Sequence, residues 1–179
     1  MRAAFLGVLG LVCVVATAQG QLDSALPAPF TQHLWTVSGV VNNGLVTVFP
    51  CTNASDSTVT VGVEVFGPAG TSLNDPTTTA IAVPPGSTVI FGTKAAAGFS
   101  VDAALNVGIL HAGSARILAT NKGIICNAIL ADWQSVPPSS MANLAIIKRW
   151  AYNVARLGRR PNAQTQASDC CLADCVSRA

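Results

Sequence analysis

Residues 58–66 read TVTVGVEVF, and this stretch decides the fold class. Valine occupies every second position, with threonine, glycine and glutamate between. Successive side chains of a β-strand point to opposite faces, so a period of two predicts a strand with one buried face and one face in water. The expected core residues on this strand are Val59, Val61, Val63 and Val65, with Val89, Phe91, Ile117 and Ile125 as neighbours.

Similar apolar segments lie on both sides of this strand, separated by turn residues. The clearest turns are residues 42–44 (NNG), 84–86 (PPG) and 121–123 (NKG), because glycine and asparagine accept positive φ and proline fixes φ. We expect the first and third of these turns to close hairpins. The other predicted strands are 33–38, 45–51, 79–83, 87–92, 115–120 and 124–131, with shorter candidates at 99–102 and 107–110.

The number and spacing of these strands predict an all-β fold. Half of the residues are apolar, and 15 glycines and 10 prolines supply turns for many short strands. No strand alternates with a long helix, which argues against a parallel α/β sheet. The layout resembles that of small immunoglobulin-like domains, so we expect an immunoglobulin-like antiparallel β-sandwich of about 7–9 strands.

The end of the patterned region allows two interpretations. Residues 144–148 could form a last strand of the sheet. Alternatively, Leu144, Ile147, Ala151 and Val154 have the spacing of an amphipathic helix. The sequence alone leaves residues 144–157 open between strand and helix.

The N-terminus has the three parts of a secretory signal peptide. Arg2 supplies a positive charge, residues 4–15 are apolar or glycine, and residues 16–18 (ATA) are small. The expected domains are therefore a signal peptide (1–18), a flexible lead-in (19–32), the β-sandwich (33–148) and a basic, cysteine-containing tail (149–179). An uncleaved anchor is the alternative. We expect a secreted, periplasmic or cell-surface protein with no transmembrane span in the mature chain.

Five cysteines follow the predicted signal peptide. Cys51 and Cys126 both fall on predicted strands, and an oxidising compartment would favour a disulfide between them. The alternative is two reduced, buried thiols. Cys170, Cys171 and Cys175 lie near the C-terminus without a nearby histidine, which makes a poor zinc site. Their pairing stays open.

The sequence contains no catalytic motif, cofactor loop or complete metal site that we could assign. His33 and His111 are the two histidines, far apart in the chain. Together with Cys126 and Met141 they supply the ligand types of a blue-copper site, but the usual local ligand loop is missing. Residues 53–55 (NAS) match an N-glycosylation acceptor.

Charge is distributed unevenly along the chain. Residues 19–147 carry three bases and six acids, whereas residues 148–179 carry six bases and two acids. The candidates for contact with an anionic surface are Lys148, Arg149, Trp150, Arg156, Arg159 and Arg160. Such a stretch suits an anionic cell-surface polymer, or it is simply a solvated tail. We expect no specific nucleic-acid partner.

These features favour a secreted, non-enzymatic module that binds a surface or serves a structural role. Two other classes stay open: a secreted enzyme whose site is assembled from loops, and a copper or redox protein.

Overall fold

The computed structural model describes residues 25–148, which form eleven strands and no helix. The strands are β1 (Gln32–Asn43), β2 (Leu45–Asn53), β3 (Val59–Phe66), β4 (Ile81–Val83), β5 (Thr88–Gly92), β6 (Ala103–Ala104), β7 (Leu110–Ala119), β8 (Ile124–Cys126), β9 (Ile129–Asp132), β10 (Met141–Asn143) and β11 (Ile146–Lys148). The all-β prediction is confirmed. The count exceeds the expected 7–9 because residues 124–131 divide into two strands, and because β6 and β10 lack any clear alternation in sequence.

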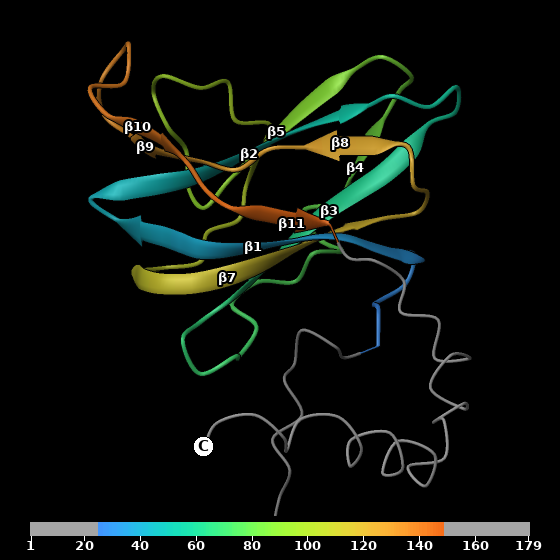
Figure 1. Cartoon of the computed structure of the whole chain (residues 1–179), viewed down its shortest axis with the longest axis horizontal. Coiled ribbons are helices and arrows are strands. Elements are labelled where there is room, and N and C mark those ends of the chain that lie inside the picture. The colour runs from blue at the N-terminus through green and yellow to red at the C-terminus, as the bar shows by residue number, and fades with distance from the viewer. Residues whose placement is uncertain (1–24, 149–179) are drawn as a thin grey trace, which may run out of the picture. The chain divides into compact units, whose positions relative to one another are not determined.

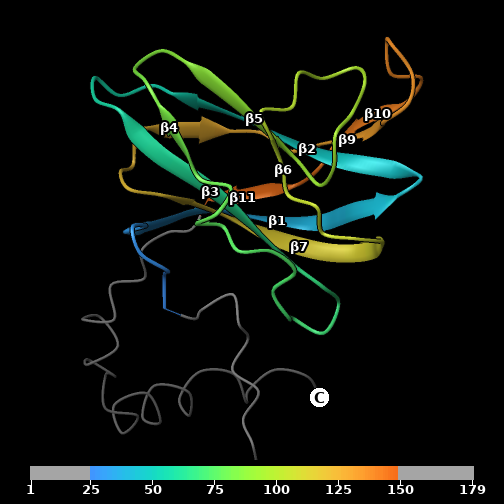
Figure 2. The same ribbon diagram turned by 180° about the vertical axis from the view of Figure 1, so that it is seen from behind.

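The strands form one connected, almost entirely antiparallel sheet that consists of two groups. The first strand group has the order β11-β1-β7-β3-β4. In the second strand group, β2 pairs with β5, β8 and β9; β9 pairs with β10, and β5 pairs in parallel with β6. Figures 1 and 2 show β1 and β7 below β2, β9 and β10, with the β1–β2 hairpin joining the groups at one end.

The hairpin predicted at residues 42–44 is confirmed. β1 and β2 pair only next to this turn, through Asn42↔Val46 and Asn43↔Leu45. Gly44 has φ +71°, a conformation that glycine adopts without a steric penalty. Beyond the turn the two strands separate: β1 pairs with β11 and β7 in the first strand group, and β2 pairs with β5, β8 and β9 in the second.

The valine face of β3 lies in the core, as the alternation predicts. Val59, Val61, Val63 and Val65 are all fully buried. Their cluster draws side chains from both strand groups, including Val89 and Phe91 of β5 and Ile117 of β7. The prediction for Ile125 is wrong, because its side chain is 62% exposed while Ile124 and Cys126 on either side of it point inward.

The opposite face of β3 is covered, whereas the sequence predicted a face in water. The Phe30 ring lies against Gly62, where no side chain would fit. Glu64 is only 7% exposed and pairs with Arg116 of β7. The segment before β1 and the loop after β3 supply this cover, and alternation within a single strand carries no information about such a distant segment.

The second predicted hairpin, around residues 121–123, is wrong. β7 belongs to the first strand group, whereas β8 and β9 pair with β2 in the second. The reason lies in the edges of β7, which are already hydrogen-bonded to β1 on one side and β3 on the other. β8 therefore has no edge of β7 to join, and residues 121–123 cross between the groups.

Of the two interpretations for residues 144–148, the strand is correct. Trp35, Thr36 and Val37 of β1 pair with Lys148, Ile147 and Ile146 of β11. The remainder of the alternative helix, beyond residue 148, lies outside the described residues. Nowhere between residues 25 and 148 is there a helix long and apolar enough to span a membrane.

Candidate functional site

The Cys51–Cys126 disulfide predicted from the sequence is present. The two cysteines face each other on β2 and β8, and both are buried. The Asn127 N–H, next to Cys126, donates to the carbonyl of Pro50, next to Cys51, at 3.0 Å. Hydrogen-bonded and non-hydrogen-bonded residue pairs alternate along antiparallel strands, so Cys51 and Cys126 form a non-hydrogen-bonded pair, the kind in which side chains are closest. The bridge anchors the short strand β8 and has a structural role. The C-terminal cysteines Cys170, Cys171 and Cys175 lie outside the described residues.

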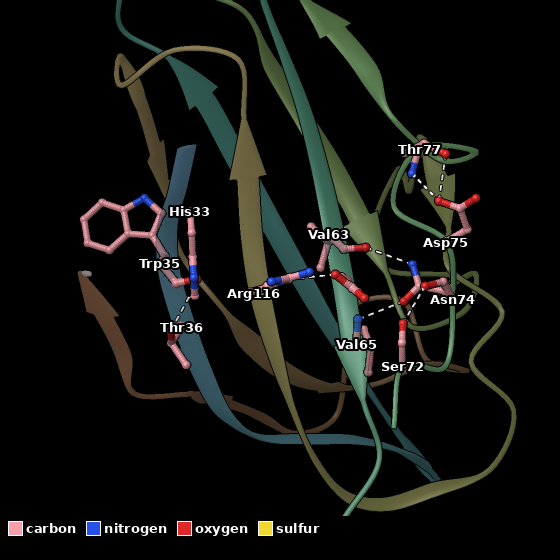
Figure 3. Close-up of polar contacts among 11 residues, drawn as sticks. His33, Trp35, Thr36, Val63, Val65, Ser72, Asn74, Asp75, Thr77 and Arg116 are labelled. Atoms are coloured by element: carbon pink, nitrogen blue, oxygen red, sulfur yellow. Dashed lines mark hydrogen bonds and ion pairs between the residues drawn. The ribbon is translucent and has the colours of Figure 1, made fainter. Parts of the chain in front are cut away.

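The four residues considered as copper ligands do not come together. His33 Nε2 lies 3.0 Å from Thr36 Oγ1 near the start of β1 (Figure 3). His111 is at the other end of the β1–β7 pair, with Nδ1 2.9 Å from Asn43 Nδ2. Cys126 is in the disulfide, and Met141 is an exposed residue of β10. Within residues 25–148, no three His, Cys, Asp or Glu side chains are grouped so as to hold a metal ion.

One of the anionic-surface candidates falls within the described residues. Lys148 ends β11 with an exposed side chain, and its Nζ lies 5.7 Å from the centre of the Trp35 ring. The other candidates lie outside the described residues: Arg149, Trp150, Arg156, Arg159 and Arg160.

Residues 53–55, which match a glycosylation motif, form hydrogen bonds within the fold. Asn53 is fully buried, and its amide nitrogen donates to the carbonyls of Ser57 and Val83 at 2.7 and 2.8 Å. Its side-chain oxygen accepts from the N–H and the hydroxyl of Ser55 at 2.9 and 2.7 Å. Every polar atom of the Asn53 side chain is thus occupied, and a glycan on it would not fit the folded protein.

A polar cavity of about 580 Å³ lies over the covered face of β3. At its base, Arg116 Nε donates to Glu64 Oε2 at 2.7 Å, and the two side chains are 2% and 9% exposed. The guanidinium also lies 5.5 Å from the Phe66 ring. The cavity is lined by Ala25, Pro27, Glu64, Ser72, Leu73, Asn74, Asp75, Pro76 and Arg116.

Polar side chains of this cavity are bonded to the protein itself (Figure 3). Asn74 accepts from the Val65 N–H and donates to the Val63 carbonyl, both at 2.8 Å, and so continues the hydrogen bonding of β3 beyond β4. Asp75 accepts from the hydroxyl and the N–H of Thr77, and these bonds lower the pKa of its carboxyl group. This pattern indicates a cavity whose polar groups maintain the fold.

A second recess lies between the loop after β5 and the loop after β9, and we call it the aromatic recess. It has a volume of about 670 Å³. Its lining residues are Ala95, Ala96, Ala97, Phe99, Ser100, Val101, Trp133 and Gln134. Next to it, Lys94 places its Nζ 3.6 Å from the centre of the Trp133 ring, a cation–π contact. Of the described residues that line the recess, none has a titratable side chain, so its chemistry suits binding better than acid–base catalysis.

Hydrogen bonds hold the two loops of the aromatic recess in place. The Ala97 N–H donates to the Trp133 carbonyl at 2.8 Å and ties the loops together. The Asp132 carboxylate accepts from the Gln134 N–H at 3.0 Å and from the Ser139 hydroxyl at 2.8 Å. Bonds from the Ser135 side chain, the Gln134 N–H and the Ser139 hydroxyl hold the pKa of Asp132 well below its usual value. The site is therefore preorganised, which reduces the entropy lost on binding.

Sequence reasoning missed this recess. Lys94 and Phe99 belong to the irregular loop after β5, where the short strand predicted at residues 99–102 is wrong. Trp133 belongs to the loop after β9, and no periodic pattern links the three residues. The only local signal was a tryptophan beside a strand end and a proline-rich turn. Comparisons with protein-family models, with curated proteins and with solved structures found no match. The functional conclusion therefore rests on the geometry of the recess.

Proposed function

We propose that the protein is an exported, immunoglobulin-like β-sandwich that binds an acidic polysaccharide at a cell surface and catalyses no reaction there. The observation that carries the proposal is the contact between Lys94 and Trp133 at the edge of the aromatic recess. A shallow site with aromatic side chains, a cation and no titratable lining residue offers recognition chemistry without an acid–base pair.

The recess matches the surface of a sugar ring that carries a carboxylate. Aromatic side chains are large and rigid, and they offer apolar faces on which the C–H groups of a sugar can pack. Gln134 and Ser100 supply hydrogen-bonding groups for hydroxyls, and the Lys94 ammonium supplies the charge that a carboxylate would pair with. The nearby Asp132 carboxylate is directed into its own loop by its hydrogen bonds, so it repels such a ligand less.

The energies involved favour a polymer over a single sugar. An exposed ion pair contributes about 0.2–1 kcal/mol, and a small apolar contact adds little more. Repeated units on a polymer raise the effective concentration and hence the avidity. Lys148 and the basic residues that follow it in the sequence were predicted to contact an anionic surface, and they would add attraction to the same anionic polymer.

Export is supported by two features. The N-terminus has the pattern of a signal peptide, and a disulfide joins Cys51 and Cys126, a bond that persists in oxidising compartments. The immunoglobulin-like classification is supported by two antiparallel strand groups that share one buried cluster. We accordingly propose that the protein acts in the periplasm, on the cell surface or in the medium.

The test is binding of the purified, exported chain to polygalacturonate, with neutral dextran as the control polymer. We expect polygalacturonate binding that weakens as salt rises, because the Debye length falls from about 10 Å at 0.1 M to about 3 Å at 1 M. Lys94→Gln and Trp133→Ala should each reduce binding, while Lys122→Gln, a change at an exposed lysine on another loop, should not. Equal binding by Lys94→Gln and Lys122→Gln would overturn the proposal, and so would cleavage of the polymer.

A further inference from the structure

The turn between β1 and β2 contains a dipeptide with its own chemistry. Asn43 is exposed at the end of β1, and Gly44 follows it with φ +71°. Nothing lies within 4 Å of the position where a side chain on Gly44 would begin. Asn43 is the only asparagine in the sequence that precedes a glycine. Gly44 therefore has no side chain, and no group near its Cα from elsewhere in the described chain, to hinder attack of its backbone nitrogen on Asn43.

An asparagine in this setting can lose its amide without an enzyme. The Gly44 nitrogen attacks Cγ of Asn43, the Cγ–Nδ2 bond breaks, and ammonia leaves with the proton from the Gly44 nitrogen. Water then opens the cyclic imide at one of its two carbonyls and gives aspartate or isoaspartate. One water is consumed and one ammonia is released, so the reaction needs neither an oxidant nor a cofactor.

Four other asparagines of the described region differ from Asn43 in both sequence and surroundings. Asn53 and Asn74 use their amide groups in hydrogen bonds to the backbone. Asn42 is buried and donates to the Gly108 carbonyl. Asn121 is exposed like Asn43, but Lys122 follows it, and the side chain of that lysine hinders attack by its backbone nitrogen.

We propose that Asn43 is a site of spontaneous deamidation, and that the His111 side chain slows the reaction. Asn43 Nδ2 lies 2.9 Å from His111 Nδ1, a distance at which the amide donates to a ring nitrogen that carries no proton. This bond holds the Asn43 side chain toward β7. Attack by the Gly44 nitrogen requires the side chain to turn back along its own backbone, so the bond must break first.

The product would change the joint between the two strand groups. Isoaspartate lengthens the backbone by one carbon at the position where Asn43 pairs with Leu45. This pair and Asn42↔Val46 are the residue pairs that join β1 directly to β2. The modified protein should therefore unfold at a lower denaturant concentration than the fresh protein.

The experiment is incubation of the full chain at mildly alkaline pH, followed by peptide mapping that separates asparagine, aspartate and isoaspartate. We expect conversion at Asn43 to be several-fold faster than at Asn121, which is the internal control. Asn43→Gln should abolish conversion of this peptide while retaining an amide in the turn. His111→Ala should raise the rate at Asn43 and leave the rate at Asn121 unchanged.

Two results would overturn the inference. Equal deamidation rates at Asn43 and Asn121 in the folded protein would show that the Asn43–Gly44 turn does not favour the reaction. An unchanged or lower rate in His111→Ala, with a native circular dichroism spectrum, would refute the role of His111. The urea-unfolded chain supplies the reference, since there the Asn43 rate reflects the dipeptide without the His111 contact.

Discussion

Arg116 of β7 donates to Glu64 of β3 at 2.7 Å, and both side chains are buried on the face of β3 that alternation predicts to be in water. The pair lies beneath the segment before β1 and the loop after β3, at the base of the polar cavity. Taking two charges out of water is unfavourable, so the pair itself adds little net stability. Because the segment before β1 and the loop after β3 keep water away from the pair, each buried charge nevertheless needs an opposite charge beside it.

The ion pair leads to a prediction about single and double substitutions. Glu64→Ala should lower the free energy of unfolding by about 3–5 kcal/mol, because it breaks a buried ion pair by removing one of the two partners. The double variant Glu64→Leu/Arg116→Met should recover much of this loss. Urea titrations measure both effects, and a single variant as stable as the wild type would contradict the burial of the pair.

The two faces of β3 should still differ in their tolerance of charge. Val63→Asp places a carboxylate in the fully buried core and should unfold the domain, because an unpaired buried charge is strongly unfavourable. Thr60→Asp should be mild, since Thr60 is only half-buried. Circular dichroism of the two variants is the measurement. Similar stability of both would mean that the strand has a different register.

Asn53 is predicted to be a structural residue that carries no glycan. Asn53→Ala should destabilise the fold by about 1–3 kcal/mol or more, because it leaves the buried carbonyl of Val83 without its donor. Ser55→Ala should be milder, since its hydroxyl is near the surface. Thermal unfolding compares the two. A glycan found on Asn53 by mass spectrometry of protein exported from a glycosylating host would refute the prediction.

The loop after β9 should be insensitive to pH except in strong acid. The folded-state pKa of Asp132 is depressed, so its contribution is complete above the unfolded value of about 3.9 and is lost as the pH falls through the lower folded value. The Gln134 amide resonance should therefore shift only in that acidic range. Asp132→Asn should remove the shift. A transition of the Gln134 resonance near neutral pH would be inconsistent with this account.

Local patterns in the sequence determined the parts of the fold that depend on neighbouring residues. Alternation over residues 58–66 identifies the buried valine face, and the asparagine and glycine at 43–44 close the first hairpin. Pro84 and Gly86 likewise form the predicted turn, in which the Ser87 N–H donates to the Pro84 carbonyl. These features need only side-chain direction and backbone dihedral preferences, which are encoded within a few residues.

Tertiary structure alone decided which strands pair and where a site forms. Residues 121–123 look like a hairpin turn in the sequence, but they cross between the strand groups, and β8 joins β2 because both edges of β7 are occupied. Cys51 and Cys126 were recognisable as partners by type and strand position, yet only the register places them opposite each other. The Lys94–Trp133 contact joins two loops that no period connects. Pairing and loop contacts depend on which edges and surfaces remain available after the rest of the chain has packed, and that information is not local.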